Sequence, residues 1–387
     1  MNKVRLGVIG FGAQGSAYAN FVYNNQVKGM QLGAVCDIDS EKREKVMNLY
    51  PEIPVYDDYI SMIESGDVDA VITTVPHYLH PDMGIKSILR GMPVIIEKPA
   101  GVYTKQVKEL LECAKLYPEV PFAIMFNQRT NPLYQEVKKI ISSGELGEIR
   151  RTNWIINTWW RSSNYYNQSQ WRATWGAEGG GVLVNQAPHQ LDLIQWLCGK
   201  PKKVYANCKF GLHRNILVEN DVTAILDYGN GATGVFVTST HDIIGTDRLE
   251  IDCDCGKIIV DNSSKATVQK LVVSETETDK NFTLSHPIKC FAENGVDNQY
   301  EERKIEFAST WGNQHCIVLE NFAAHLLHGE PILAPGSDGI YGVQLANAIL
   351  LSSWLGKEVD YDFDEDLFIE ELNKRIKEEG KYPLIKD

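Results

Sequence analysis

Long apolar runs are missing from this sequence of 387 residues. A membrane-spanning helix needs about 20 consecutive apolar residues, and no segment reaches that length. The first residues, MNKVRLGVIGFG, contain an apolar stretch only as long as a strand, and glycines rather than a cleavage site follow it. We therefore expect a cytoplasmic protein that has no membrane partner.

Basic segments are missing as well. The chain has 38 lysines and arginines against 51 acidic residues, a net charge of −13, and no run rich in lysine or arginine. Such a charge repels the phosphates of nucleic acids and the anionic surface of membranes. We expect a small-molecule partner and no nucleic acid.

Closely spaced cysteines are scarce. The one close pair, Cys253 and Cys255, lacks the two-residue gap of zinc knuckles and redox motifs, so we expect no metal site. Reduced thiols are typical of a cytosolic enzyme. The eight cysteines are dispersed along the chain: Cys36, Cys113, Cys198, Cys208, Cys253, Cys255, Cys290 and Cys316.

Internal repeats and low-complexity tracts are also missing, and 43% apolar with 23% charged residues is the composition of a globular protein. The length suits two domains. In residues 1–125, short β-branched runs alternate with amphipathic helices, which predicts an α/β dinucleotide-binding domain with a doubly wound parallel sheet. Strands are expected at Val4–Ile9, Gln31–Cys36, Ala70–Thr74, Pro93–Ile96 and Pro121–Phe126, and a helix at Pro81–Arg90.

Residues 126–387 predict a second, α+β domain that supplies the substrate pocket. Gly229-Asn230-Gly231 is typical of a hairpin turn, and strands joined by short turns run antiparallel. We therefore expect a large, mostly antiparallel sheet. Its strands are predicted at Ile149–Ile156, Val204–Phe210, Asp221–Tyr228, Ala232–Thr240, Arg248–Asp252 and Lys257–Asp261, and helices at Pro132–Ser142, Val182–Leu197, Asn313–Leu327 and Gly339–Leu355.

A GxGxxG motif follows the first strand and opens a helix, the context in which this motif binds a dinucleotide. The helix N-terminus attracts the pyrophosphate. Asp37, 22 residues beyond Gly15, can accept both ribose hydroxyls and would repel a 2′-phosphate, so NAD is expected over NADP, although Arg43 lies close in sequence. The motif residues are Gly10, Phe11, Gly12, Ala13, Gln14 and Gly15.

Lys98 follows the strand that ends at Ile96, at the carboxyl edge where parallel sheets bind ligands. Its ammonium can stabilise negative charge on a reacting oxygen, and the alternative is an ordinary exposed lysine. Other residues at the same edge are expected to contact the cofactor: Thr74, Pro76, His80 and Glu97.

Asn185 and His189 follow a triple glycine and lie four residues apart, so a continuous helix would project both from one face. His189 can take up a hydroxyl proton. Pro188 makes that geometry less secure. Asp192 is expected either to orient His189 or to satisfy buried helix polarity.

Seven aromatic residues lie between Trp154 and Trp175, interspersed with arginines and amides. Aromatic faces suit pyranose rings, so a bulky sugar or aryl glycoside is the expected ligand. An oligomer interface or core cluster is the alternative. The arginines could instead bind the carboxylate of a sugar acid. The residues expected to bind substrate are Lys98, Trp160, Arg161, Trp171, Arg172, Asn185 and His189.

The GxGxxG motif, the EKP at 97–99, the SGELGEI at 143–149 and the GGGVLVNQAPHQLD at 179–192 together resemble the Gfo/Idh/MocA oxidoreductases. The resemblance implies a Rossmann domain, an open-faced C-terminal sheet, a homo-oligomer (dimer, tetramer or hexamer), and catalytic roles for Lys98 and His189. Many members carry aspartate where this chain has Asn185, which cannot act as an acid or base.

The resulting prediction is an NAD-dependent dehydrogenase that oxidises a secondary hydroxyl of a sugar, glycoside or inositol. Two alternatives remain. One is a glycosidase that uses NAD for transient oxidation and elimination. The other is an inactive nucleotide-binding regulator.

Overall fold

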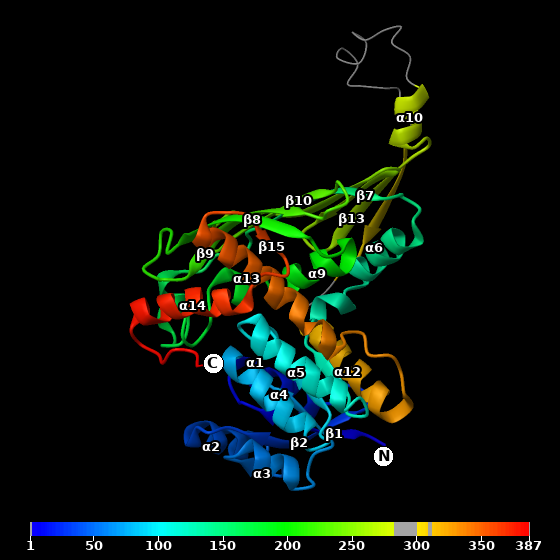
Figure 1. Ribbon diagram of the computed structural model, residues 1–387. Helices are drawn as coiled ribbons and strands as arrows, with labels where there is room; N and C mark the ends of the chain where they lie inside the picture. Colours follow the sequence, from blue (N-terminus) through cyan, green and yellow to red (C-terminus); the bar gives the residue numbers. More distant parts are fainter. Residues whose placement is uncertain (1, 282–299, 309–311, 387) are drawn as a thin grey trace.

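Two sheets, one above the other, form the frame of the molecule in a computed structural model (Figure 1). The structure describes residues 2–281, 300–308 and 312–386. The N-terminus lies beside the first sheet, and the last helix lies under the second.

The first sheet is fully parallel, with strand order β3-β2-β1-β4-β5-β6. This confirms the predicted doubly wound sheet. Because the order reverses between β1 and β4, a crevice opens at the carboxyl ends of these strands, where such folds bind ligands. The strands are β1 (Val4–Ile9), β2 (Met30–Cys36), β3 (Val55–Tyr56), β4 (Ala70–Thr73), β5 (Val94–Ile96) and β6 (Phe122–Ile124).

Helices cover both faces of the first sheet. On one face, α1 (Ala13–Tyr23) and α2 (Ser40–Leu49) contribute to a core that also contains α12 (Asn313–His328). The other face packs against α3 (Tyr59–Glu64), α4 (His80–Ile88) and α5 (Thr104–Leu116). A helix from late in the chain therefore completes the first core, and the division at residue 125 stays a prediction.

The second sheet has strand order β14-β13-β12-β11-β7-β10-β9-β8-β15, and every neighbouring pair except β7 and β10 is antiparallel. The predicted mostly antiparallel sheet is confirmed. Its strands are β7 (Ile149–Ile156), β8 (Lys203–Phe210), β9 (Glu219–Asp227), β10 (Thr233–Ser239), β11 (Asp247–Cys253), β12 (Gly256–Asp261), β13 (Lys265–Leu271), β14 (Tyr300–Glu306) and β15 (Val359–Asp360).

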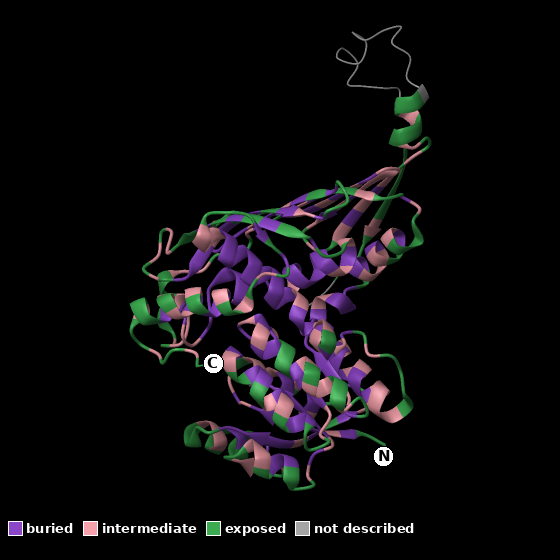
Figure 2. Cartoon of the chain, in the orientation of Figure 1, coloured by how far each residue is buried: buried purple, intermediate pink, exposed green. Residues whose placement is uncertain are grey.

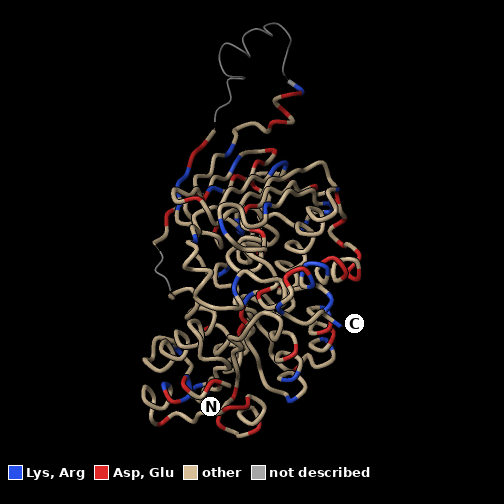
Figure 3. The backbone as a smooth tube through the Cα atoms, turned by 90° about the vertical axis from the view of Figure 1, so that its left-hand side faces the viewer, with Lys and Arg blue, Asp and Glu red and all other residues tan. Residues whose placement is uncertain are grey.

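Among the described residues, helices cover one face of the second sheet and leave the other open, as Figure 2 shows. Along β8, Val204 and Ala206 are buried whereas Tyr205 is exposed, the period-2 pattern of a sheet with one open face. Lysines, arginines and acidic residues are interspersed along the chain in the half that contains the second sheet (Figure 3). The covering helices include α6 (Pro132–Ser143), α9 (Pro188–Cys198), α13 (Gly339–Leu355) and α14 (Glu365–Glu379).

The single helix expected at Val182–Leu197 is wrong. A short helix, α8 (Val182–Asn185), ends before Gln186, and α9 begins at Pro188. Proline lacks the N–H that a continuous helix would need at this position, and it suits the first turn of a new helix instead. Asn185 and His189 therefore lie on different helices.

Seven cysteines in the described part of the chain are free thiols, and Cys290 lies outside the described residues. No helix among the described residues is long and apolar enough to cross a membrane.

Arg129 forms a buried ion-pair group with two carboxylates. Its guanidinium donates two hydrogen bonds to Asp192, at 2.8 and 2.6 Å, and one to Asp338 at 2.6 Å. Arg129 is 2% exposed, so its charge depends on these partners. Of the two roles expected for Asp192, satisfying buried polarity is the one observed, and the partner is Arg129 rather than His189.

Replacing Asp192 by alanine is expected to lower the free energy of unfolding by about 3–5 kcal/mol, because it leaves the Arg129 charge buried without its two-bond partner. Urea denaturation followed by circular dichroism measures the change. As a control, Asp82→Ala removes an exposed ion pair with Lys86 and should cost less than about 0.5 kcal/mol. Equal losses from the two substitutions would contradict this account.

Candidate active site

The glycine loop after β1 has the shape that a dinucleotide requires. Gly10 has a φ of +92°, which other residues rarely adopt. A Cβ at Gly15 would lie 1.9 Å from the carbonyl oxygen of Gly10, so only glycine lets α1 approach the strand. A Cβ at Gly12 would meet no atom within 4 Å, so this glycine faces open space.

The amino terminus of α1 points its backbone N–H groups into this space. Its N-cap, Gly12, carries no side chain that could bond those groups, and Ala13 and Gln14 form the first turn. Free N–H groups and the positive end of the helix dipole attract phosphate. The loop therefore fits the pyrophosphate of NAD.

Asp37 lies at the end of β2 and faces the glycine loop. One carboxylate oxygen accepts the Phe11 N–H at 2.7 Å and the other accepts the Asp39 N–H at 2.9 Å. The guanidinium of Arg43 donates to the carbonyl oxygens of Asp37 and Ile38, both at 2.9 Å. The carboxylate is thus fixed where it can accept ribose hydroxyls.

Two other predicted cofactor residues tie neighbouring loops together. The Thr74 hydroxyl donates to the carbonyl oxygen of Gly10 at 2.6 Å. The two ring nitrogens of His80 lie 2.7 and 2.8 Å from the carbonyl oxygens of Pro99 and Val75. Both side chains thereby hold the backbone of the loops that border the crevice. Their contact with the cofactor, and that of the exposed Pro76, stays a prediction.

Lys98 connects the two halves of the molecule. It follows β5, and its Nζ donates a hydrogen bond of 2.8 Å to the carbonyl oxygen of Asn185 at the end of α8. Burial lowers the pKa of Lys98, while Glu97 and Glu178 favour its charged form. The predicted Lys98 and Asn185 are thus brought together.

Glu97 fixes the start of the loop that carries Lys98. Its carboxylate accepts a hydrogen bond from the Tyr18 hydroxyl and another, at 2.9 Å, from the Lys98 N–H. Glu97 is 7% exposed, and burial raises its pKa. These contacts give Glu97 a role in positioning Lys98, and its expected contact with the cofactor stays a prediction.

His189 lies in the first turn of α9, close enough to Lys98 for the lysine charge to affect the His189 pKa. Burial, followed by the charges of Lys98 and His315, lowers its pKa well below the usual range, so the ring is neutral. The buried Nδ1 has no hydrogen-bond partner in the described part of the chain. A neutral imidazole can accept a proton, as a general base must.

Glu178 is a site residue that the sequence did not predict. It is 2% exposed and accepts hydrogen bonds from the Asn185 side-chain amide and the Ala173 N–H. Burial raises its pKa to about 7. A glutamate in a glycine-rich loop looks like a surface residue, so nothing local in the sequence indicates its burial.

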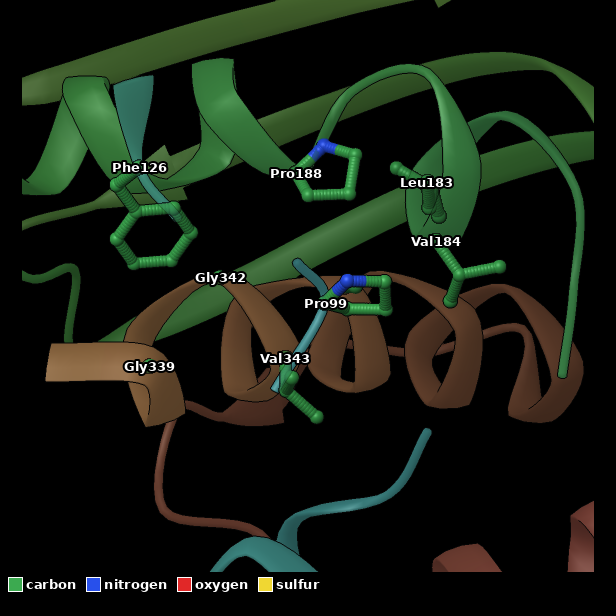
Figure 4. A pocket seen from close by; sticks show the side chains of 9 residues that line it. Pro99, Phe126, Leu183, Val184, Pro188, Gly339, Gly342 and Val343 are labelled. Carbon is green, nitrogen blue, oxygen red and sulfur yellow. The ribbon is translucent and has the colours of Figure 1, made fainter. Parts of the chain in front are cut away.

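A small apolar cavity of about 10 Å³ lies behind the site (Figure 4). Pro99, which follows Lys98, and Pro188, which precedes His189, both line it and face α13. A Cβ at Gly342 would lie 3.3 Å from the Pro188 carbonyl oxygen, so this glycine permits the close approach. One helix therefore supports the backbone on both sides of the site.

The aromatic segment divides into core and site residues. Trp154 and Trp175 are fully buried in the second core, as the alternative interpretation expected. The guanidinium groups of Arg161 and Arg172 lie 4.9 and 4.6 Å from the centre of the Tyr165 ring.

Both arginines also interact with the Lys98 charge, so the substrate segment and the lysine face the same region. Arg172 lies 4.9 Å from the centre of the Trp171 ring, and Trp160 is 42% exposed. Arg161 and Arg172 thus lie near Lys98, and the contact of the predicted substrate residues with substrate stays a prediction.

Comparison with known families identifies the chain. Residues 4–122 match the model described as an oxidoreductase family with an NAD-binding Rossmann fold, and residues 134–259 match the GFO/IDH/MocA C-terminal domain. The chain belongs to the Gfo/Idh/MocA family. It is therefore an NAD-binding oxidoreductase, as the sequence motifs predicted.

Relatives within the Gfo/Idh/MocA family align over most of the chain. The uncharacterized oxidoreductase YrbE of Bacillus subtilis is 23% identical over 370 residues, which cover 94% of this chain and 98% of that protein. Inositol 2-dehydrogenase of Rhizobium meliloti is 24% identical over 357 residues, which cover 90% and 96%.

Solved Gfo/Idh/MocA-type structures share the fold. The WlbA dehydrogenase from Bordetella pertussis, in complex with NADH and UDP-GlcNAcA, superimposes with a TM-score of 0.77 at 23% identity, covering 94% of this chain and 99% of that one. Levoglucosan dehydrogenase, in complex with NADH and levoglucosan, gives 0.76 at 18% identity, with coverage of 93% and 100%.

Replacing Asp37 by asparagine is expected to raise the Kd for NAD about tenfold, because the neutral amide is a weaker acceptor for ribose hydroxyls than a carboxylate. The preference for NAD over NADP should shrink, since the repulsion of a 2′-phosphate is lost. Calorimetric titration measures both affinities.

The matched control is Asp57→Asn, which removes an exposed carboxylate just after the neighbouring strand β3. It should leave both affinities unchanged. If Asp37→Asn binds NAD as tightly as the wild type, the ribose-binding role of Asp37 is lost.

Proposed function

We propose that this protein is an NAD-dependent dehydrogenase that oxidises a secondary hydroxyl of a sugar, glycoside or inositol to a ketone, reversibly. The observation that carries the proposal is the hydrogen bond of 2.8 Å from Lys98 to the Asn185 carbonyl oxygen, with the neutral His189 close by. It joins an ammonium at the crevice of the NAD-binding sheet to the end of α8 in the other half, four residues before the predicted base His189.

The chemistry divides between the residues as follows. Lys98 donates a hydrogen bond to the substrate hydroxyl oxygen and stabilises the negative charge that develops there. His189 takes the hydroxyl proton on a ring nitrogen, which its neutral state permits. Asn185 orients the substrate, because an amide neither gains nor loses a proton. NAD, when bound, accepts the hydride that leaves the carbinol carbon.

The proposed cofactor contacts follow from the same crevice. The backbone of the Gly10–Gly15 loop would hold the pyrophosphate, and Asp37 would hold the adenosine ribose. Thr74, His80 and Glu97 keep the loops around the nicotinamide end in place through their own hydrogen bonds.

The segment that carries Arg161 and Arg172 supports the proposed substrate class. Aromatic rings such as Trp160 and Trp171 suit the apolar faces of a pyranose or cyclitol, and the relatives named for inositol and levoglucosan act on rings of this kind. Three cations, Lys98, Arg161 and Arg172, meet in this region. Arg161 Nε is buried with no partner among the described residues, so a sugar that carries a carboxylate is the second candidate.

We also propose that the protein forms a homo-oligomer in the cytoplasm. The open face of the second sheet exposes Tyr205, Ile225 and Ile155 by 45%, 49% and 42%, apolar area that a second copy can cover. The number of subunits is not part of the proposal.

Replacing Lys98 by methionine is expected to reduce kcat about 100-fold or more, because the developing alkoxide loses its cation while the side chain keeps a similar length. The Kd for NAD should change less than about threefold. Steady-state NADH formation from a panel of cyclitols, aldoses and glycosides gives kcat, and calorimetry gives the Kd.

The control is Lys86→Met on the exposed side of α4, which should leave kcat unchanged. Turnover by Lys98→Met close to that of the wild type would remove the assignment. Absence of turnover by the wild type itself across the panel, despite NAD binding, would refute the proposed function.

A matched pair of p-nitrophenyl β-glucoside and β-glucuronide tests the charge of the substrate. With a sugar acid as substrate, we expect the glucuronide to have a KM about tenfold lower, the size of one charge-assisted hydrogen bond. Arg161→Met should remove most of this difference. The control, Arg151→Met, changes an exposed arginine on β7 and should preserve it.

The opposite result decides for a neutral substrate. If the glucoside is preferred and Arg161→Met affects both compounds equally, the two guanidinium groups bind hydroxyls rather than a carboxylate.

A further inference from the structure

The Glu178 carboxylate is buried, and its burial requires partners that compensate for the loss of water. Glu178 is 2% exposed in the segment that precedes the triple glycine, and taking a carboxylate out of water is costly unless partners compensate. Its partners are the Ala173 N–H, the Asn185 side-chain amide, and Arg172 with a nitrogen at 3.9 Å. A ring nitrogen of His77 lies 2.9 Å from the Glu178 carbonyl oxygen, which fixes the backbone of the same residue.

The hydrogen bond to Asn185 fixes which way its amide faces. A carboxylate can only accept, so it holds the amide nitrogen toward itself and turns Oδ1 away. No donor in the described part of the chain bonds that oxygen. Oδ1 is therefore available as an acceptor for a substrate hydroxyl. A neutral side chain at position 178 could accept or donate and would no longer impose this orientation.

The same carboxylate contributes negative charge beside Lys98. The Lys98 Nζ bonds the carbonyl oxygen of Asn185, and Asn185 in turn bonds Glu178 through its side chain. Asn185 supplies no charge of its own. Glu178 brings a carboxylate to the region through a different stretch of chain.

We propose that Glu178 is a positioning residue that keeps Lys98 in its ammonium form and directs the Asn185 amide oxygen toward the substrate. The proposal rests on the function proposed above for Lys98, and it adds to the site an acidic group that Asn185 does not supply.

The proposal has a consequence for pH. The Glu178 pKa is raised to about 7, so the carboxylate is ionised above that pH and protonated below it. Since the ionised form supports Lys98, kcat/KM should rise with pH through about 7. The pKa of His189 lies well below its usual range, so this histidine does not produce the limb.

Other charged and titratable groups lie near Lys98 and Glu178 and also affect their protonation. Those around Lys98 are Glu97, Glu178, Arg161, Arg172, His77, His80, His189 and His315. Those around Glu178 are Lys98, Arg172, Glu219 and Tyr166. The test therefore changes Glu178 itself and follows the pH profile.

Glu178→Gln makes the side chain neutral at every pH while it keeps its size. We expect the acid limb near pH 7 to disappear and kcat/KM at pH 8 to fall about tenfold. At high pH, kcat/KM should fall as Lys98 loses its proton. This basic limb should move down by about one pH unit in Glu178→Gln, because Lys98 loses a neighbouring negative charge and gives up its proton more easily.

Glu219→Gln is the matched control. Glu219 is equally buried, its pKa is also raised to about 7, and it accepts hydrogen bonds from the N–H groups of Gly181 and Leu183 at the start of α8. It supports the fold of the loop without bonding Asn185. We expect it to lower stability and leave both limbs of the pH profile in place.

A charge swap separates positioning from mere packing. In Glu178→Gln/Asn185→Asp the carboxylate moves to position 185 and the amide to position 178, so the pair keeps its hydrogen bond and its charge. We expect kcat/KM to recover at least about fivefold relative to Glu178→Gln alone. If Glu178→Gln fails to fold, the swap can still be compared with the wild type.

A measurement that needs no substrate can test the role of Glu178 even if the proposed dehydrogenase function is wrong. The rate of Lys98 acetylation by acetic anhydride, followed against pH by mass spectrometry, reports the Lys98 pKa in each variant. A lower midpoint in Glu178→Gln supports the proposal even if no sugar is oxidised. Unchanged midpoints and an unchanged pH profile in Glu178→Gln would overturn it, as would a swap variant with no recovery.

Discussion

The burial of one ammonium group is the constraint on which the site depends. Lys98 is partly withdrawn from water between the two halves of the molecule, and burial by itself lowers its pKa and so disfavours its charged form. It can remain charged because a carbonyl oxygen accepts its hydrogen bond and carboxylates lie nearby. A charge that is held without much water around it interacts strongly with whatever charge forms beside it.

The fold supplies these neighbours from several directions. Glu97 is fixed by the Tyr18 hydroxyl of α1, and the loop after Lys98 is held by α13, where the Asn347 side chain bonds the Val102 carbonyl oxygen at 2.9 Å and the Thr104 N–H at 3.1 Å. The same α13 packs against Pro188. One buried helix thus determines how the lysine loop and the histidine helix lie relative to each other.

The sequence predicted the fold well because its periodic patterns are strong. The βαβ alternation, the glycine loop and the strand Ile149–Ile156 all have local causes that a single chain displays. Strand β14 (Tyr300–Glu306) was missed because it lies at the sheet edge and is almost wholly exposed, so it shows no apolar alternation.

The site was predicted in part, for a similar reason. Lys98 and Asp37 follow strands, and strand ends can be located from sequence. The bond between Lys98 and Asn185 uses a backbone carbonyl, a group that every residue has, so no side-chain pattern could reveal it. Glu178 became visible only when its burial was known, because partners across loops decide whether an acid is withdrawn from water.

The position of α12 (Asn313–His328) has a consequence for how the chain is made. Its residues Leu319, Phe322 and Ala323 pack against the first sheet, beside strands synthesised some 300 residues before (Figure 1). Until that helix leaves the ribosome, one face of the first sheet exposes apolar surface to solvent. The nascent protein must shield this surface while the residues between β6 and α12 are translated.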